Sequence, residues 1–190
     1  MKIEVLWNQL VGSGCEHLTL NQNGNIEADS LAVGVLDGAV YRIRYHIVCD
    51  ASWNVQRVSA TSLLDDRNIS LIRNGDAWLD GQNHAIEALR GCSDVDIMVT
   101  PFTNTLPIKR LHLSPGDAKE ISVVYISAPD LVVSRFEQRY TCLSHDQKSG
   151  VYKYESLKSG FTAELKIDAD GLVTDYPGIF KLMWKKADMK

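Results

Sequence analysis

The sequence predicts a mainly β protein that combines a long, curled antiparallel sheet with a single short α-helix. Three observations support this fold class. Glycines next to asparagine, aspartate or serine recur along the chain and divide it into short segments, as hairpin turns do. Several of these segments alternate apolar and polar side chains with a period of two, as strands with one buried face do. One stretch after Pro101 has helical spacing instead.

The turn signals run from one end of the chain to the other. They are Asn23-Gly24-Asn25, Asp37-Gly38, Asn74-Gly75-Asp76, Asp80-Gly81, Pro115-Gly116-Asp117, Ser149-Gly150, Ser159-Gly160 and Asp170-Gly171. They follow one another without a βαβ rhythm or a break in composition, so they predict an antiparallel meander forming one domain over residues 1–190. Because exposed edges of a large sheet invite unwanted pairing, the meander must curl or close.

Three segments of this meander need separate interpretation. Alternation is clearest at residues 41–47 and 161–167, where apolar side chains occupy the odd positions and polar ones the even positions. Residues 121–126 are apolar on both faces apart from one serine, so we place this strand centrally, covered on each side. Residues 82–89 are ambiguous between a short helix and an irregular strand, and we interpret them as strand or loop.

Residues 91–111 form the densest run of unusual residues, and the run begins with a strand. Asp94, Asp96 and Met98 would share one face of that strand, because successive side chains alternate. Thr100-Pro101 then ends it, since proline has no N–H for the ladder and holds the preceding residue out of the helical region. The strand therefore carries two acids on one side.

The single helix is expected directly after this proline. Thr103 or Asn104 can cap its first turn, and Pro107 would fall in or near that turn, where a missing N–H costs little. Large side chains recur every four residues from Phe102 onward, which is the spacing of one helix face. The sequence therefore predicts a short helix here.

The same run resembles the signature of the putative glycolipid-binding family, formerly a domain of unknown function. The resemblance extends over almost the whole chain. It is carried by Cys92-x-Asp94-Val95-Asp96-Ile97, residues 100–111, Trp7, Tyr41-x-Ile43-x-Tyr45, Trp53, Trp78, Gln138-Arg139-Tyr140, Gly171-Leu172-Val173 and Tyr176-Pro177-Gly178. It implies a spiral β-roll around one helix, usually dimeric, and a lipid or glycolipid as ligand. It implies no catalytic residues.

Composition excludes several other classes of protein. The chain has 190 residues, a net charge of −4 and a pI near 5.7, which argue against a nucleic-acid surface. The basic group Lys181, Lys185, Lys186 and Lys190 is interpreted as a frayed, solvated tail rather than a contact for anionic lipids.

Neither a signal sequence nor a membrane-spanning stretch is evident, so we expect a cytoplasmic protein without integral membrane association. Cys15, Cys49, Cys92 and Cys142 would then be reduced, each a small buried apolar residue.

Asp94 and Asp96 are the best candidates for chemistry. Two carboxylates on one strand face can divide acid and base roles, and a hydrolase would use them with help from Arg110 or His112. The structural interpretation is stronger, because a half-buried acid beside a helix can pair with Lys109 or Arg110. No histidine or cysteine spacing indicates a metal, and no motif indicates a cofactor.

The leading interpretation is a non-enzymatic binding module with its ligand on the concave face of the sheet. Thirteen aromatic residues are candidates to line a groove, although most are expected in the core. The residues assigned to ligand binding are Trp78, Asp94, Asp96, Phe102, Asn104, Arg110, Arg139 and Tyr140. A homodimer is expected. The alternatives are the hydrolase and a ligand-free homodimeric interaction module with a fully packed interior.

Overall fold

The computed structural model describes residues 1–188 and consists mainly of strands. The strands are β1 (Lys2–Gln9), β2 (Ser13–Asn23), β3 (Asn25–Leu36), β4 (Ala39–Cys49), β5 (Val55–Ser62), β6 (Asn68–Asn74), β7 (Ala77–Leu79), β8 (Asp94–Ile97), β9 (Ala118–Ile126), β10 (Val133–His145), β11 (Ser149–Ser156), β12 (Thr162–Asp168), β13 (Val173–Tyr176) and β14 (Phe180–Asp188). The helices are a 3₁₀-helix (Glu87–Leu89) and α1 (Phe102–Leu111).

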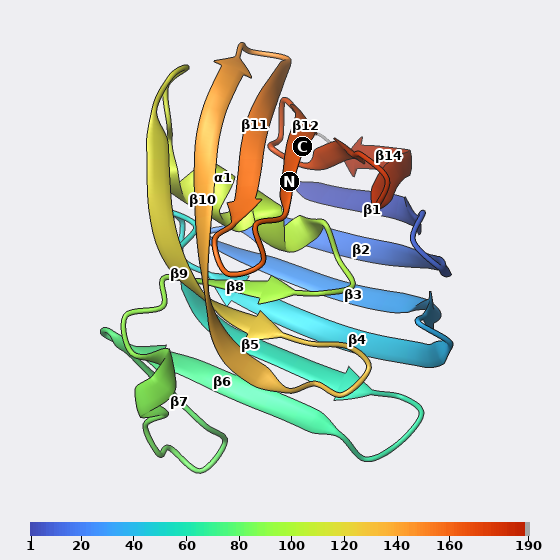
Figure 1. Cartoon of the computed structure of the whole chain (residues 1–190), viewed down its shortest axis with the longest axis vertical. Helices are drawn as coiled ribbons and strands as arrows, with labels where there is room; N and C mark the ends of the chain where they lie inside the picture. Colours follow the sequence, from blue (N-terminus) through green and yellow to red (C-terminus); the bar gives the residue numbers. More distant parts are fainter. Residues whose placement is uncertain (189–190) are drawn as a thin grey trace.

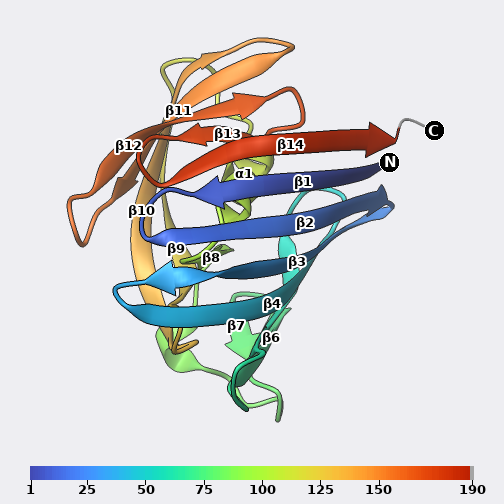
Figure 2. The same ribbon diagram turned by 90° about the vertical axis from the view of Figure 1, so that its right-hand side faces the viewer.

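All 14 strands belong to one sheet, in the order β7-β6-β5-β4-β3-β2-β1-β14-β13-β12-β11-β10-β9-β8. The first and last strands of the described chain pair with each other, so the two halves of the meander meet at β1 and β14. The sheet curls until β8 lies over its own inner face, and α1 fills the space inside (Figure 1). The predicted curled sheet around one short helix is confirmed. Figure 2 shows β14 and β1 to β4 side by side on the near wall.

Alternation of apolar and polar residues decides which face of each strand turns inward. In β4, Tyr41, Ile43 and Tyr45 are buried, while Arg42 and Arg44 between them are exposed. The inward residues form two adjoining apolar clusters, one mainly under β1 to β8 that also includes Val124 and Ile126 of β9, and one under β9 to β14. Helix α1 contributes to both clusters and therefore joins the two halves of the sheet.

The helix begins earlier than the sequence indicated. Its N-cap is Pro101, whose side chain has no polar atom that could accept from the first turn. The hydroxyl of Thr100 instead accepts from the N–H of Phe102 at 3.0 Å. Capping by Thr103 or Asn104 is therefore wrong. Pro107 is the sixth of ten residues and not part of the first turn.

Strands β8 and β9 run parallel, with α1 as the crossover between them. The expectation that the sheet would contain no βαβ unit is therefore wrong. Strand β9 also lies one strand from the edge of the sheet, not at its centre. Strand β9 is apolar on both faces because both faces are covered, as in other parallel strands: Val123 and Val124, which point in opposite directions, are both buried.

Three further expectations are corrected. The C-terminal lysines do not form a frayed tail through residue 188: Lys181, Lys185 and Lys186 belong to β14, which pairs with β1, and Lys190 lies outside the described residues. Cys15 is exposed, whereas the other cysteines are buried, and all four are free thiols. Ser149-Gly150 opens β11, and the turn lies just before it.

Residues 82–89 combine a turn, an isolated bridge between Leu79 and Ala85, and the 3₁₀-helix. Within residues 1–188 no helix has the length and apolar character that crossing a bilayer requires.

Candidate functional site

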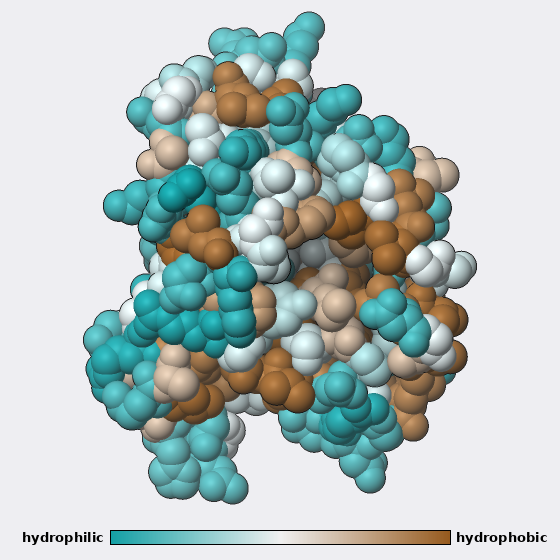
Figure 3. Space-filling view, in the orientation of Figure 1, coloured by the Kyte–Doolittle hydropathy of each residue, from teal (hydrophilic) through white to brown (hydrophobic). Residues whose placement is uncertain are grey.

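A cavity of about 410 Å³ opens at the centre of the curled sheet, beside α1. In the orientation of Figure 3 the surface is hollowed near its centre, and apolar side chains border the hollow on one side. Residues from both halves of the chain line this central cavity. They are Gln9, Val11, Leu36, Asp96, Ile97, Met98, Thr100, Asn104, Tyr125, Phe136, Tyr154, Ser156, Ser159, Phe161, Tyr176, Ile179 and Phe180.

Aromatic rings from the C-terminal half form one wall of the central cavity. Tyr125 and Phe136 stack with ring centroids 4.4 Å apart. Tyr154, Phe161 and Tyr176 form a second group, with centroids 6.2 to 6.3 Å apart. The rings pack within each group and, apart from Phe161 just before β12, they belong to strands of the sheet, so the wall is held in place before any ligand arrives.

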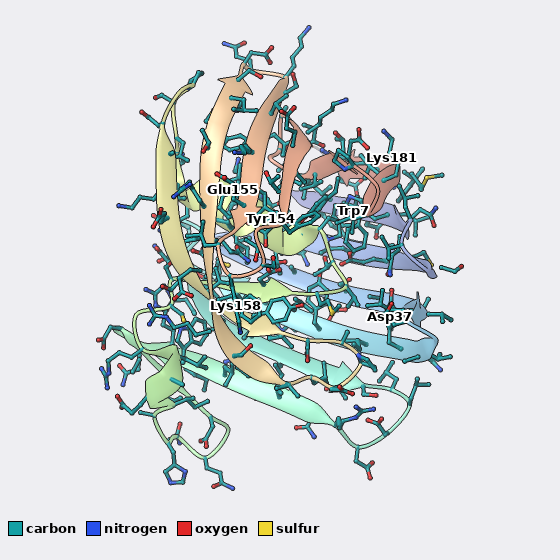
Figure 4. The ribbon with its side chains drawn as sticks, in the orientation of Figure 1. Trp7, Asp37, Tyr154, Glu155, Lys158 and Lys181 are labelled. Carbon is teal, nitrogen blue, oxygen red and sulfur yellow. The ribbon has the colours of Figure 1, made fainter. Side chains whose placement is uncertain are left out.

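One lysine lies against this wall from outside. The ammonium of Lys158, from the turn after β11, sits 4.8 Å from the centroid of the Phe136 ring. Figure 4 shows Tyr154 and Lys158 on one side of the opening and Asp37, at the β3–β4 turn, on the other.

Polar groups form the floor of the central cavity. Asp96 accepts from the amide of Gln138 at 2.6 Å and from the hydroxyl of Thr103 at 3.1 Å. The amide of Asn104, from α1, donates to the hydroxyl of Tyr140 at 2.8 Å. Burial raises the pKa of Asp96 above its ordinary value, although its hydrogen bonds from Gln138 and Thr103 oppose the shift.

Asp94 has a different role from Asp96, although both belong to β8. Its carboxylate is fully buried and accepts from the Nε of Arg110 at 3.1 Å and from its Nη2 at 2.6 Å. The hydroxyl of Ser93 donates to the same carboxylate at 2.7 Å. This paired acid ties β8 to the last turn of α1 and does not line the central cavity.

Besides Asp94, a second fully buried acid, Glu16, lies on the inner face of β2. The Oε1 of Glu16 accepts from the hydroxyls of Tyr45, Ser30 and Thr100, the last two at 2.7 and 2.9 Å. The Oε2 atom has no hydrogen-bond partner among the described residues. Burial raises the pKa of Glu16 to about 7, because desolvation outweighs the three hydrogen bonds.

The structure brings some of the predicted site residues together and separates others. Asp96 and Asn104 line the central cavity, and Tyr140 lies directly behind Asn104. Phe102 is fully buried in the core and does not line the cavity. Arg110 is occupied by Asp94.

Trp78 and Arg139 lie away from the central cavity. The indole N–H of Trp78 donates to the carbonyl of Cys92 at 3.0 Å inside the core. Arg139 is on the outer face of β10, paired with Glu120 and Glu155.

Sequence reasoning missed the contributions of Gln9, Thr100 and Ser156 to the cavity, and it missed Glu16 beneath Thr100. Of these residues, only Glu16 could have been recognised from the sequence. It lies two residues before Leu18 and four before Leu20, on a strand face that is otherwise apolar.

His112 lines a second cavity, of about 340 Å³, at the C-terminal end of α1 together with Lys109 and His145. His112 therefore lines a different cavity from Asp96. Among the described residues, no group of three or more histidine, cysteine, aspartate or glutamate side chains is placed to hold a metal ion.

Taken together, the fold and the central cavity define a class of protein: a single sheet, antiparallel except at β8 and β9, rolled around one helix, with a ligand-sized aromatic cavity inside the curl. The model of the family described as putative glycolipid-binding matches residues 4–181, and the chain belongs to this family. A crystal structure of a DUF1089 family protein from Pseudomonas aeruginosa has a TM-score of 0.77 and 37% sequence identity, covering 87% of this chain and 91% of that one.

A second similarity concerns only part of a much larger protein. An alpha-2-macroglobulin homolog from Yersinia pestis is 37% identical over 91 residues. The match covers 44% of this chain and 4% of that protein.

Proposed function

We propose that the protein binds a lipid or glycolipid in the central cavity. The observation that carries the proposal is the combination of an aromatic wall with a small set of polar groups in one open cavity. A volume of about 410 Å³ falls within the range of about 300–1,000 Å³ that small-molecule sites occupy. The description of the family points to the same class of ligand.

The border of the central cavity supports an amphiphilic ligand. Val11, Met98 and Phe161 line the cavity and remain 43%, 38% and 42% exposed. Apolar side chains at an opening gain from contact with hydrocarbon, which would remove them from water. A purely polar ligand would leave this border uncovered.

The two alternatives from the sequence are less well supported. A hydrolase that divides acid and base roles between Asp94 and Asp96 needs both carboxylates near the substrate, but Asp94 is held by Arg110 and only Asp96 lines the central cavity. A ligand-free interaction module was expected to have a fully packed interior, and an open cavity does not fit that expectation.

Native mass spectrometry of protein purified without detergent tests the proposal, followed by organic extraction and identification of the released molecules. We expect a lipid or glycolipid in stoichiometric amount, and the Phe161→Ser variant should retain less of it. Trp184→Ser is the matched control, because Trp184 is an aromatic residue of similar exposure, 47%, that does not line the cavity. Protein that is free of lipid and also refuses added lipids would contradict the proposal.

The same spectra test two further proposals. We propose a homodimer, which would give twice the mass of 21.2 kDa expected for one chain.

We also propose a cytoplasmic location, which four unpaired cysteines fit because reducing compartments keep thiols free. A mass shift showing oxidised cysteines in freshly isolated protein would contradict that location.

A further inference from the structure

We propose that the central cavity takes an uncharged, hydroxyl-rich head group, such as a neutral sugar, head first, with Asp96 and Asn104 selecting it and the hydrocarbon chain leaving across the border. This inference rests on the proposed function and specifies its ligand. Three features of the cavity carry it: the order of polar and apolar residues from floor to opening, the unused hydrogen-bonding groups on the floor, and the charge of the lining.

The polar side chains of the central cavity are concentrated away from its border. Asn104 is only 4% exposed and the carboxylate of Asp96 beside it is half-buried, and the buried apolar side chains of Ile97 and Phe180 complete this inner part of the lining. Its border is largely apolar, with Val11, Met98 and Phe161 partly exposed. Buried polar groups cost free energy unless they are hydrogen-bonded, so a hydrocarbon chain on this floor would be unfavourable. A polar head group on the floor and a chain along the border satisfy both regions.

The floor offers both donors and acceptors. Asn104 uses one amide hydrogen on Tyr140, and its side-chain oxygen and second amide hydrogen make no hydrogen bond within residues 1–188. Each oxygen of Asp96 accepts one hydrogen bond and can accept another. Hydroxyl groups donate and accept at once, which matches a carboxylate beside an amide. The aromatic wall presents faces that can pack against the C–H groups of a sugar ring.

The charge of the lining disfavours anionic head groups. Among the described residues that line the central cavity, one is acidic, Asp96, and none is lysine, arginine or histidine. Phosphate recognition normally uses arginine or lysine, and like charges repel strongly where water is excluded. The N-terminus of α1 borders the cavity, but the N–H groups of Phe102 and Asn104 already donate to Thr100 and Pro101. Lys158 lies over the Phe136 ring from an exposed turn, but it does not line the cavity.

The test uses three amphiphiles with the same eight-carbon chain, octyl glucoside, octyl phosphate and octyltrimethylammonium, titrated below their micelle concentrations by calorimetry. We expect the glucoside to bind at least about tenfold more tightly than either charged ligand, since one good hydrogen bond accounts for roughly that factor. The phosphate would meet the carboxylate of Asp96 without a cation in the lining, and the trimethylammonium group has neither a donor for Asp96 nor an acceptor for the amide of Asn104. Asp96→Asn and Asn104→Ala should each weaken glucoside binding about tenfold. Asp66→Asn, which changes an exposed acid in the β5–β6 turn away from the cavity lining, is the matched control and should bind like the wild type.

Chain length tests the orientation of the ligand. If the chain leaves the cavity, shortening octyl glucoside to butyl glucoside should reduce affinity less than replacing its glucose by phosphate does. If the chain were buried instead, removing four methylenes would cost about a hundredfold or more and would overturn the head-first orientation.

The outcomes distinguish failure of the head-group selection from failure of lipid binding itself. Equal affinity for all three octyl ligands would overturn the head-group selection while leaving lipid binding intact. Binding of none of them would overturn both proposals. The comparison of ligands on the wild-type protein decides the selection even if the Asp96 variant fails to fold.

Discussion

Replacing Arg110 with methionine should destabilise the fold severely, because it leaves a buried carboxylate without its cation. Asp94 is fully buried and its partner Arg110 is only 17% exposed, so water cannot replace the guanidinium. The variant loses the hydrogen bonds of 3.1 and 2.6 Å from Arg110, and only the hydroxyl of Ser93 remains at the carboxylate. Removing one member of a buried ion pair typically costs about 3–5 kcal/mol, and we expect a loss in that range.

Urea unfolding at neutral pH, followed by circular dichroism, measures this loss as a lower free energy of unfolding. The double variant Asp94→Asn/Arg110→Met should be more stable than Arg110→Met alone, because it no longer buries an uncompensated charge. Arg139→Met is the control, since that arginine pairs with Glu120 at the surface and should change stability little. A loss below about 1 kcal/mol in Arg110→Met, as for a surface ion pair, would refute the structural role of the pair.

Two further predictions concern β2 and β3. With its pKa raised to about 7 in the folded protein against an ordinary value of 4.5, Glu16 keeps its proton when folded and loses it when unfolded between these pH values. The free energy of unfolding of the wild type should therefore fall by a few kcal/mol relative to Glu16→Gln as the pH rises from about 4.5 to 7, and parallel pH profiles in chemical denaturation would contradict this. Gly34→Ala should lower stability by about 1–3 kcal/mol, because a Cβ there would lie 2.5 Å from the carbonyl oxygen of Ser13 and 2.6 Å from the Tyr41 hydroxyl. Gly81→Ala, with no atom within 4 Å of the added Cβ, should leave the melting temperature unchanged, and equal melting temperatures for the two variants would refute the packing argument.

The sequence predicted the features that depend on near neighbours. The alternation of Tyr41, Ile43 and Tyr45 identified the inner face of β4, and the proline after Thr100 placed the start of the helix within a few residues. These signals are local, because strand and helix periodicity are written within a few consecutive residues.

Pairing between distant segments was not predictable in the same way. Strand β14 pairs with β1 from Lys2 opposite Asp188 onward, and a lysine-rich segment at the end of a chain carries no sign of a partner so far away in the sequence. The parallel pairing of β8 with β9 was missed for a related reason. Its only local signal was the apolar character of both faces of β9, which equally fits a central antiparallel strand.

The same limit explains which site residues were predicted. Asp96 and Asn104 belong to one conspicuous run of sequence, so chemistry and proximity pointed to them together. The aromatic wall comes from the segment from β9 to β13, and only the curl of the sheet brings Tyr154 into one cavity with Gln9, at the end of β1, and Val11 in the turn that follows. Arg139 was assigned to the site because it neighbours Tyr140, but adjacent residues of a strand face opposite ways, which places it outside.

The two faces of α1 explain why the curled sheet contains a cavity beside a packed core. Phe102 and Leu106 lie four residues apart on one face of α1 and are fully buried in the core. Asn104 lies on the opposite face, about 200° around the helix from Phe102, where it meets Tyr140 and the central cavity. An apolar residue at this position would extend the core towards the aromatic wall, whereas an amide needs polar neighbours. Asn104, together with Thr103 that donates to Asp96, thus gives the cavity polar groups where apolar residues would extend the core.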